Sequence, residues 1–220
     1  MPLNDLIYVC AVSDYNLAEL ECCLLRRPKH VVLMVSNFHK AQEGAERLQA
    51  QLESQLSGVQ VHRPDKTQNA YFNGQNFAEC QAWVVSVLMP YLCALPRYIK
   101  ICNITGGTKL YALVLAQPQL GWHQMDYKSE EHSVQVFEFN NGGLVLHKQE
   151  HLSSAPPLVV AKLYSSKVVE VLPNQIIIKE PEKSVIIAQK MWDALSQPQS
   201  EEGQALLTLF GHKKHGFEAV

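Results

Sequence analysis

Three runs of the chain are almost continuously apolar over the length of a β-strand, and they constrain the fold more than any other feature. They are residues 6–12, 30–35 and 98–102. A strand with one face in water alternates apolar and polar residues, whereas a continuous apolar run suits a strand buried on both faces. Leucines at helical spacing follow the first run, and residues 40–56 form an amphipathic helical pattern after the second. This alternation predicts an α/β fold, a Rossmann-like parallel sheet with helices on both faces.

The remaining elements follow from similar patterns. Asn76 can cap a helix over residues 77–95, and Pro90 predicts a kink or break within it. The polar stretch 63–75 before this helix predicts a loop. Further strands are expected at residues 59–62, 122–127, 134–139 and 144–147, with a hairpin turn at residues 141–143 and a helix at residues 109–117.

Composition narrows the class of protein. The formal net charge is −2, so the chain has no overall electrostatic attraction for duplex nucleic acid. None of the six cysteines belongs to a C-x-x-C pair, which favours buried free thiols over a disulfide scaffold or a zinc site. We therefore expect no metal and no other cofactor. No signal peptide or membrane-length apolar segment is recognised, which predicts a soluble, cytoplasmic protein without membrane partners.

A change of character near residue 152 predicts two parts. A chain of 220 residues suits one large domain, or one domain of about 150 residues with an appendage. The Ser-Ser-Ala-Pro-Pro stretch at residues 153–157 marks a boundary between a ligand-binding domain, residues 1–152, and a small C-terminal α+β appendage, residues 153–220. In the appendage we expect a hairpin of residues 168–172 and 175–178, and helices at residues 183–195 and 201–210. The appendage is a candidate dimerisation or linker element.

The heptapeptide Asn-Ile-Thr-Gly-Gly-Thr-Lys, residues 103–109, is the strongest functional signal. It joins a predicted strand to a predicted helix, an arrangement in which backbone N–H groups point at a phosphate. Thr105 and Thr108 add hydroxyl donors, and Lys109 adds a positive charge that opposes the helix dipole. The heptapeptide therefore predicts an anion site. The alternative is an ordinary Gly-Gly turn in which Thr108 caps the helix.

Two other polar turns, residues 13–16 and 36–39, also follow predicted strands. Because a doubly wound sheet binds ligands at the carboxyl ends of its strands, we expect all three turns to lie at one site. The known nucleotide and nucleophile motifs are absent: the sequence contains neither G-x-x-x-x-G-K-[ST], nor G-x-S-x-G, nor G-x-G-x-x-G after its first strand.

The heptapeptide, together with Val12-Ser13-Asp14 and Asn16 after the first strand, resembles the CRISPR-associated Rossmann fold (CARF) domains. The resemblance covers about residues 4–150 and is strongest to the CARF–nuclease effectors of type III CRISPR systems. It implies a homodimer whose shared groove binds a cyclic oligoadenylate, most often cyclic tetra-adenylate. A two-fold dimer suits a ring with approximate two-fold symmetry.

The resemblance also implies roles for individual residues. Gly106, Gly107, Thr108 and Lys109 would bind phosphate or ribose, while Asn103 and Thr105 would shape the turn. The other candidate ligand-binding residues are Ser13, Asp14 and Asn16, with Ser36, Asn37 and Phe38 as weaker candidates. Tyr71 or Phe72 could stack on an adenine, although packing is the more frequent role of such residues.

Three functions remain open. The chain is either a sensor that acts through a separate effector protein, or a ring nuclease that cleaves the ring without a metal. In the second case Lys109, Ser13 and Thr108 would be the catalytic residues, acting by positioning and charge stabilisation. No nuclease domain is recognisable in residues 153–220, so the chain is a sensor alone or is cut short of its effector domain. The third possibility is a monomeric α/β protein that binds a mononucleotide or sugar phosphate.

Overall fold

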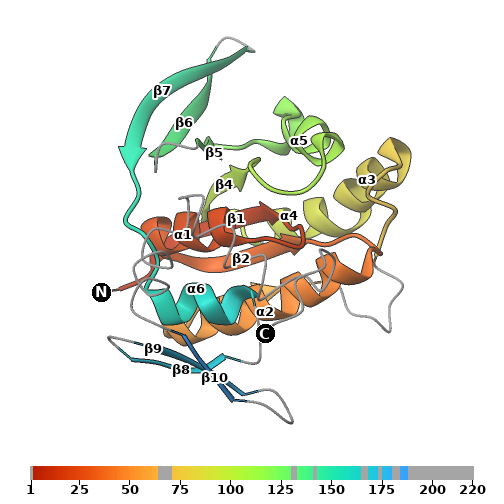
Figure 1. Cartoon of the computed structure of the whole chain (residues 1–220). Helices are drawn as coiled ribbons and strands as arrows, with labels where there is room; N and C mark the ends of the chain where they lie inside the picture. Colours follow the sequence, from red (N-terminus) through yellow and green to blue (C-terminus); the bar gives the residue numbers. More distant parts are fainter. Residues whose placement is uncertain are drawn as a thin grey trace. The chain divides into compact units, whose positions relative to one another are not determined.

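The computed structural model describes residues 2–63, 71–129, 133–140, 143–164, 168–172, 175–179 and 184–187. The chain divides into two compact units, Met1–Ser153 and Ser154–Val220. Figure 1 shows the larger unit as a central sheet with helices around it, and the smaller unit as one helix and a small sheet.

Seven strands form the sheet of the first unit, as far as it is described, in the order β3-β2-β1-β4-β5-β6-β7. The strands are β1 Asn4–Ala11, β2 Pro28–Met34, β3 Gln60–His62, β4 Ile99–Asn103, β5 Gln124–Lys128, β6 Ser133–Asn140 and β7 Gly143–His151. The first five are parallel, as expected, whereas β6 and β7 pair antiparallel. The antiparallel pair β6–β7 confirms the predicted hairpin, whereas β6 does not continue the predicted parallel sheet, because the short segment between β5 and β6 cannot form a crossover connection.

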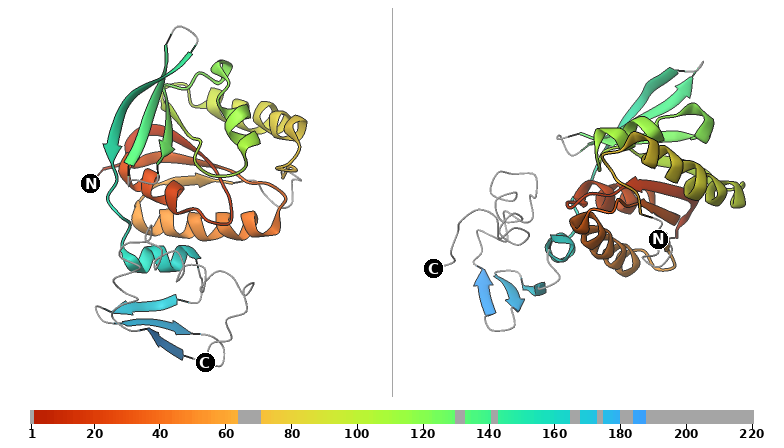
Figure 2. Two further views of the ribbon diagram at one scale, coloured as in Figure 1. Left: turned by 45° about the horizontal axis from the view of Figure 1, so that its top comes forward. Right: turned by 90° about the vertical axis from the view of Figure 1, so that its right-hand side faces the viewer.

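Helices cover both faces of this sheet (Figure 2). Helices α1, Leu17–Arg26, and α2, His39–Gln55, contact each other on one face. The other face carries α3 Phe77–Trp83, the π-helix η2 Val84–Leu88, α4 Met89–Ala94, α5 Lys109–Leu115 and the 3₁₀ turn η3 Pro118–Leu120. The structure therefore confirms the predicted α/β, Rossmann-like fold with helices on both faces.

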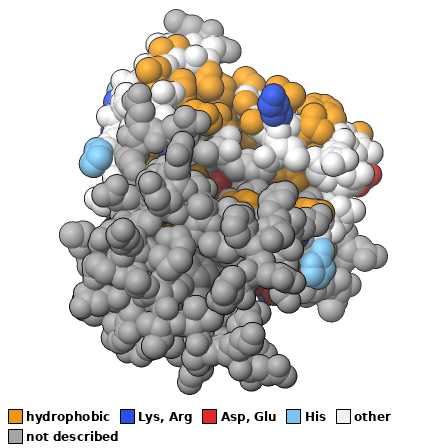
Figure 3. All heavy atoms as spheres, in the orientation of Figure 1, with side chains coloured by type: hydrophobic (Ala, Val, Ile, Leu, Met, Phe, Trp, Pro, Cys, Tyr) orange, Lys and Arg blue, Asp and Glu red, His pale blue; other side chains and the backbone are white. Residues whose placement is uncertain are grey.

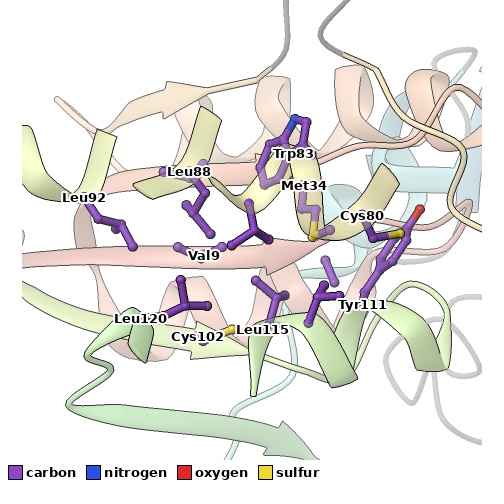
Figure 4. Packing of buried hydrophobic residues seen from close by; sticks show 14 of the residues in the cluster. Val9, Met34, Cys80, Trp83, Leu88, Leu92, Cys102, Tyr111, Leu115 and Leu120 are labelled. Carbon is purple, nitrogen blue, oxygen red and sulfur yellow. The ribbon is translucent and has the colours of Figure 1, made fainter. Parts of the chain in front are cut away.

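Alternate residues of the central strands face opposite helical layers. On β1, Val9 packs against Trp83 and Leu88 of the α3–α4 segment, as Figure 4 shows. Tyr8 and Cys10 face the other side, where the Cys10 sulfur lies 3.8 Å from the Cys23 sulfur of α1. Both sets are fully buried, which explains why the strand sequence does not alternate with polar residues.

The segment from α3 to α4 confirms the predicted cap and shows how the chain accommodates Pro90. The side chain of Asn76 accepts hydrogen bonds from the N–H groups of Ala78 and Glu79. Pro90 has no N–H to donate, and the wider π turn Val84–Leu88 immediately precedes it. Phe77–Ala94 has a mean hydropathy of 1.3 and is long enough to cross a membrane by length and composition alone. Its apolar residues contribute to the core in Figure 4.

The second unit contains helix α6, Pro157–Tyr164, and the antiparallel sheet β10-β9-β8. Strands β8, Val168–Leu172, and β9, Gln175–Lys179, form the expected hairpin. The prediction of a helix from residue 183 is wrong for Ser184–Ile187. This segment is strand β10, and its β-branched residues pair with β9. Helix α6 was not predicted. The predicted helix 201–210 and the turn residues 141–142 lie outside the described residues.

Candidate functional site

A pocket of about 590 Å³ lies at the carboxyl ends of β1 and β2, beside the turn that follows β4. Strand β1 lies between β2 and β4, so the chain leaves β1 in one direction and later returns to its other side. This reversal of strand order is the topological switch point, where open α/β sheets bind their ligands. The pocket is lined by Val12, Ser13, Asp14, Ser36, Asn37, Phe38, His39, Ala41, Asn73, Gly74, Gln75, Gly107, Thr108 and Tyr111.

The loop after β1 contributes Ser13 and Asp14 to the lining, but not Asn16. Asn16 is buried, accepts a hydrogen bond from the Ser13 N–H at 2.9 Å and donates one to the Ser13 carbonyl at 3.0 Å. It therefore shapes the loop. The Asp14 carboxylate lies 3.6 Å from both Lys40 Nζ and the Arg47 guanidinium of α2, which balance its negative charge next to the pocket.

The loop after β2 contributes Ser36, Asn37 and Phe38, together with His39 at the start of α2. A parallel bridge pairs Ser36 with Phe72, and the Asn37 N–H donates to the Phe72 carbonyl at 2.8 Å. This pairing brings residues 73–75 to the pocket from a distant part of the sequence.

The two aromatic candidates from the polar loop do not line this pocket. Phe72 is buried, and its ring packs against the rings of Trp83 and Tyr111. Tyr71 is half-buried and lies in a separate shallow depression with Trp83. Phe72 therefore has a packing role and does not lie where it could stack on an adenine in this pocket.

The heptapeptide divides into inner and outer residues. Asn103 is fully buried, and its side-chain oxygen accepts a hydrogen bond from the Thr105 N–H at 2.8 Å. The Thr105 hydroxyl in turn accepts one from the Lys128 N–H of β5 at 2.8 Å. These contacts hold the turn against the sheet, and of the heptapeptide only Gly107 and Thr108 line the pocket.

Both glycines of the turn are required by close packing on its inner side. A Cβ at Gly106 would overlap the Glu19 carboxylate and the Ala11 carbonyl oxygen. Gly107 has a φ of 74°, and a Cβ there would overlap the ring of Tyr111.

The contacts of Thr108 and Lys109 are not those of an ordinary Gly-Gly turn in which Thr108 caps the helix. The Thr108 hydroxyl donates to the Gly74 carbonyl at 3.0 Å, and no side-chain hydrogen bond caps α5. Lys109 is exposed at the first position of this helix and does not line the pocket. The structure shows no ion pair of Lys109 with any other residue it describes.

Sequence patterns missed Asn73, Gly74, Gln75 and Tyr111. They placed His39 in the turn 36–39 but gave it no role. The Tyr111 ring lies beneath Gly107, and its hydroxyl occupies the place that a Cβ at Gly74 would take. Burial raises the pKa of Tyr111, so the hydroxyl stays protonated at neutral pH. Tyr111 thus joins two loops of the pocket. Its position one helical turn after Thr108 was the available sequence signal.

Among the described residues, no group of three His, Cys, Asp or Glu side chains could hold a metal ion. Five of the six cysteines are buried, and Cys93 is exposed.

No protein-family model and no curated protein matches this sequence. Solved structures do match it. One is Can2 from Sulfobacillus thermosulfidooxidans in complex with cyclic tetra-adenylate, with a TM-score of 0.53 and 20% identity, covering 74% of this chain and 42% of that one. Another is protein VC1899 from Vibrio cholerae, with a TM-score of 0.56 and 12% identity, covering 72% of this chain and 39% of that one.

A third match is a type III CRISPR defence DNA nuclease activated by cyclic oligoadenylate. Its TM-score is 0.52 at 13% identity, covering 96% of this chain and 31% of that one. At these identities the likeness shows the fold alone, and it agrees with the Rossmann-like fold that the resemblance implies. This chain spans less than half the length of each of these structures.

Proposed function

We propose that this chain is a sensor of cyclic oligoadenylate in type III CRISPR antiviral signalling, with cyclic tetra-adenylate as its ring. The main support is the pocket at the switch point, which the heptapeptide turn and the loops after β1 and β2 line together. The fold of the chain is shared with a structure solved in complex with cyclic tetra-adenylate.

The charges around the pocket suit a phosphate. The Asp14 carboxylate is balanced by Lys40 and Arg47, and Lys109 adds a positive charge at the start of α5. The Gly107 backbone reaches the pocket with no side chain in front of it. A bound phosphodiester would accept hydrogen bonds from this backbone. Lys109 does not line the pocket, so its flexible side chain would have to extend toward the ring to donate a charge-assisted hydrogen bond. The site is local, which agrees with a net charge of only −2.

The size of the pocket supports a homodimer. A volume of about 590 Å³ suits one drug-sized ligand. A ring of four nucleotides is larger than such a ligand, so one chain would hold about half of it. A second copy related by a two-fold axis would hold the other half. We therefore expect one ring per two chains.

Isothermal titration calorimetry with cyclic tetra-adenylate, cyclic hexa-adenylate, linear tetra-adenylate and AMP tests this function. Binding of the tetra-adenylate ring at one per two chains supports it. The absence of heat with both rings contradicts it, and binding of AMP at one per chain to a monomer supports the mononucleotide alternative.

Lys109→Ala is expected to weaken ring binding by roughly 10- to 100-fold, because it removes a charge-assisted hydrogen bond. Arg97→Ala is the matched control, since Arg97 is exposed at the opposite end of β4 and carries the same charge. Both variants should unfold at the wild-type urea midpoint. Equal losses of affinity in the two variants would reject a specific role for Lys109.

His39 favours a second candidate function, a metal-independent ring nuclease. It lines the pocket, and its Nδ1 lies 3.5 Å from the Glu43 carboxylate one turn along α2, which can orient the imidazole. His39 could accept the proton of a ribose 2′-hydroxyl as its oxygen attacks the adjacent phosphorus and the 5′-oxygen leaves. Ser13, Thr108 and Lys109 would then stabilise the developing charge.

Incubation of the ring with protein in EDTA tests cleavage. The expected products are linear di-adenylates that end in 2′,3′-cyclic phosphate, and His39→Gln should abolish them while the ring still binds. An intact ring after prolonged incubation rejects this activity. In either case we propose a cytoplasmic protein with the second unit as a dimerisation or linking element. As a sensor it would act through a separate effector protein, and as a ring nuclease it would switch the signal off.

A further inference from the structure

Glu19 is a buried acid beside the ligand-binding turn. It lies in the first turn of α1 and is 1% exposed. Neither of its carboxylate oxygens has a hydrogen-bond partner in another described residue. An isolated buried carboxylate is costly, so its position needs a physical reason.

The carboxylate lies directly against the backbone of Gly106, in the space where a side chain at that position would be. The Ala11 carbonyl oxygen at the end of β1 borders the same space. Glu19 therefore supports the turn from its inner side, while Gly107 and Thr108 of the same turn line the pocket.

The groups that face Glu19 come from three elements. Lys128 of β5 is the neighbouring cation, but its ammonium lies 2.6 Å from the Glu21 carboxylate, which balances it. The other neighbours are the buried thiols of Cys10 on β1 and of Cys22 and Cys23 on α1. Glu19 thus faces one cation that already has an ion-pair partner.

Burial raises the pKa of Glu19 to about 7, and its own N–H and the charge of Lys128 offset part of that effect. Near neutral pH the group is therefore present in both its protonated and its ionised form.

We propose that Glu19 is a positioning residue of the anion site, which supports the Gly106–Gly107 turn and takes up a proton when a phosphate binds on the other side. The inference rests on the proposed function. An ionised Glu19 places a negative charge behind the turn that receives a phosphate, and like charges disfavour each other. The protonated carboxyl removes this repulsion. Linkage then requires that protonation strengthens anion binding as much as the anion favours protonation.

Below pH 7 Glu19 is protonated, so the affinity for the anion is highest there. Affinity falls as pH rises through 7 and becomes constant above the higher pKa of the liganded state. His39 also lines the pocket, where its imidazole is a second ionisable group. Variants must separate the two groups.

Titration calorimetry of the full chain with cyclic tetra-adenylate between pH 6 and 8.5 makes that separation, because phosphodiesters stay ionised throughout. Wild-type affinity is expected to fall about tenfold over this range. His39→Gln should keep the fall. Glu19→Gln, which imitates the protonated carboxyl, should make the affinity independent of pH when it is added to His39→Gln. A fall that persists in this double variant, or disappears in His39→Gln alone, overturns the proposal.

A second measurement needs no variant. Near pH 7.5, wild-type protein should take up about half a proton per chain on binding, so the heat differs between buffers of different ionisation enthalpy, such as PIPES and Tris. Identical heats in the two buffers overturn the proposal. Ring binding with neither pH dependence nor proton uptake rejects this inference alone. No ring binding at any pH rejects the proposed function and this inference with it.

Discussion

Gly106 and Gly107 are adjacent in the sequence, yet a different physical constraint requires each of them. Gly106 has no room for a Cβ because the Glu19 carboxylate and the Ala11 carbonyl are already there. Gly107 adopts a positive φ and also lies against the Tyr111 ring. The turn is thus defined by side chains beneath it as much as by its own sequence.

Gly107→Ala is expected to lower the free energy of unfolding by about 2–4 kcal/mol and to weaken ring binding, because it adds a clash with Tyr111 to the cost of a positive φ. Gly121→Ala is the matched control, since Gly121 has a φ of 64° and no atom within 4 Å of an added Cβ. The control should lose only about 1–2 kcal/mol. Urea denaturation measures both, and equal losses would show that Tyr111 does not constrain the turn.

Glu19→Gln is expected to change how stability depends on pH. The pKa of Glu19 is raised in the folded chain from 4.5 to about 7, so the unfolded chain ionises first. The stability associated with the protonated group is complete below about pH 4.5 and is lost as pH rises through 7. Between pH 5 and pH 8 the free energy of unfolding should therefore fall by up to about 3 kcal/mol more in wild type than in the variant. A difference that stays constant from pH 5 to 8 in urea denaturation would argue against the raised pKa.

At the level of elements, a buried ionic network joins α1 to the far half of the sheet. The Asp126 carboxylate on β5 accepts hydrogen bonds from Tyr8 at 2.9 Å, Arg26 at 2.8 Å and Gln124 at 2.6 Å. Arg26, at the end of α1, also pairs with Glu150 on β7. These contacts connect the parallel strands to the antiparallel pair β6–β7.

Asp126→Ala is expected to lower the free energy of unfolding by about 3–5 kcal/mol, since it leaves the Arg26 guanidinium without its buried partner. Asp5→Ala is the control, because Asp5 is 80% exposed and its ion pair with Lys29 is 3.4 Å long. That exposed pair should contribute little. Similar urea midpoints for the two variants would contradict a structural role for the network.

At the level of the whole molecule, the proposed dimer should cover the surface around the pocket. Helix α5 begins at the turn that lines the pocket, and its Leu113 is 61% exposed. Figure 3 shows apolar side chains gathered on the upper part of the molecule. Strand β7 also carries exposed apolar residues, namely Leu144, Val145 and Leu146. Large exposed apolar patches are typical of interaction surfaces.

Leu113→Glu is expected to shift the protein from twice the mass of one chain to the mass of a single chain, as measured by light scattering after size-exclusion chromatography. A buried charge at the interface would be unpaired in both copies. Ile99→Glu provides the comparison, because Ile99 is equally apolar and exposed but lies at the opposite end of β4 from the turn. A dimer that persists in Leu113→Glu places the interface elsewhere.

Much of the larger unit was determined by local sequence pattern. Continuous apolar runs predict β1, β2 and β4 because the central part of a strand buried on both faces has no side chain in water. The Asn76 cap and the heptapeptide turn could also be predicted from the sequence, since capping and Gly-Gly turns depend on residues that are neighbours in the chain. Local pattern predicted a helix over Ser184–Ile187, but this segment pairs with β9 and is a strand.

The sequence predicted that the three polar turns meet, whereas the rest of the pocket lining was decided by the tertiary structure alone. Sheet order places β4 beside β1, so the turn after β4 meets the loop after β1. The bridge from Ser36 to Phe72 then brings Asn73–Gln75 to the same place. Glu19 and Tyr111 belong to helices whose sequences show only amphipathic spacing, and their relation to the two glycines appears only when the helices pack. Periodicity reports which face of an element is buried, whereas the partner on that face depends on the path of the whole chain.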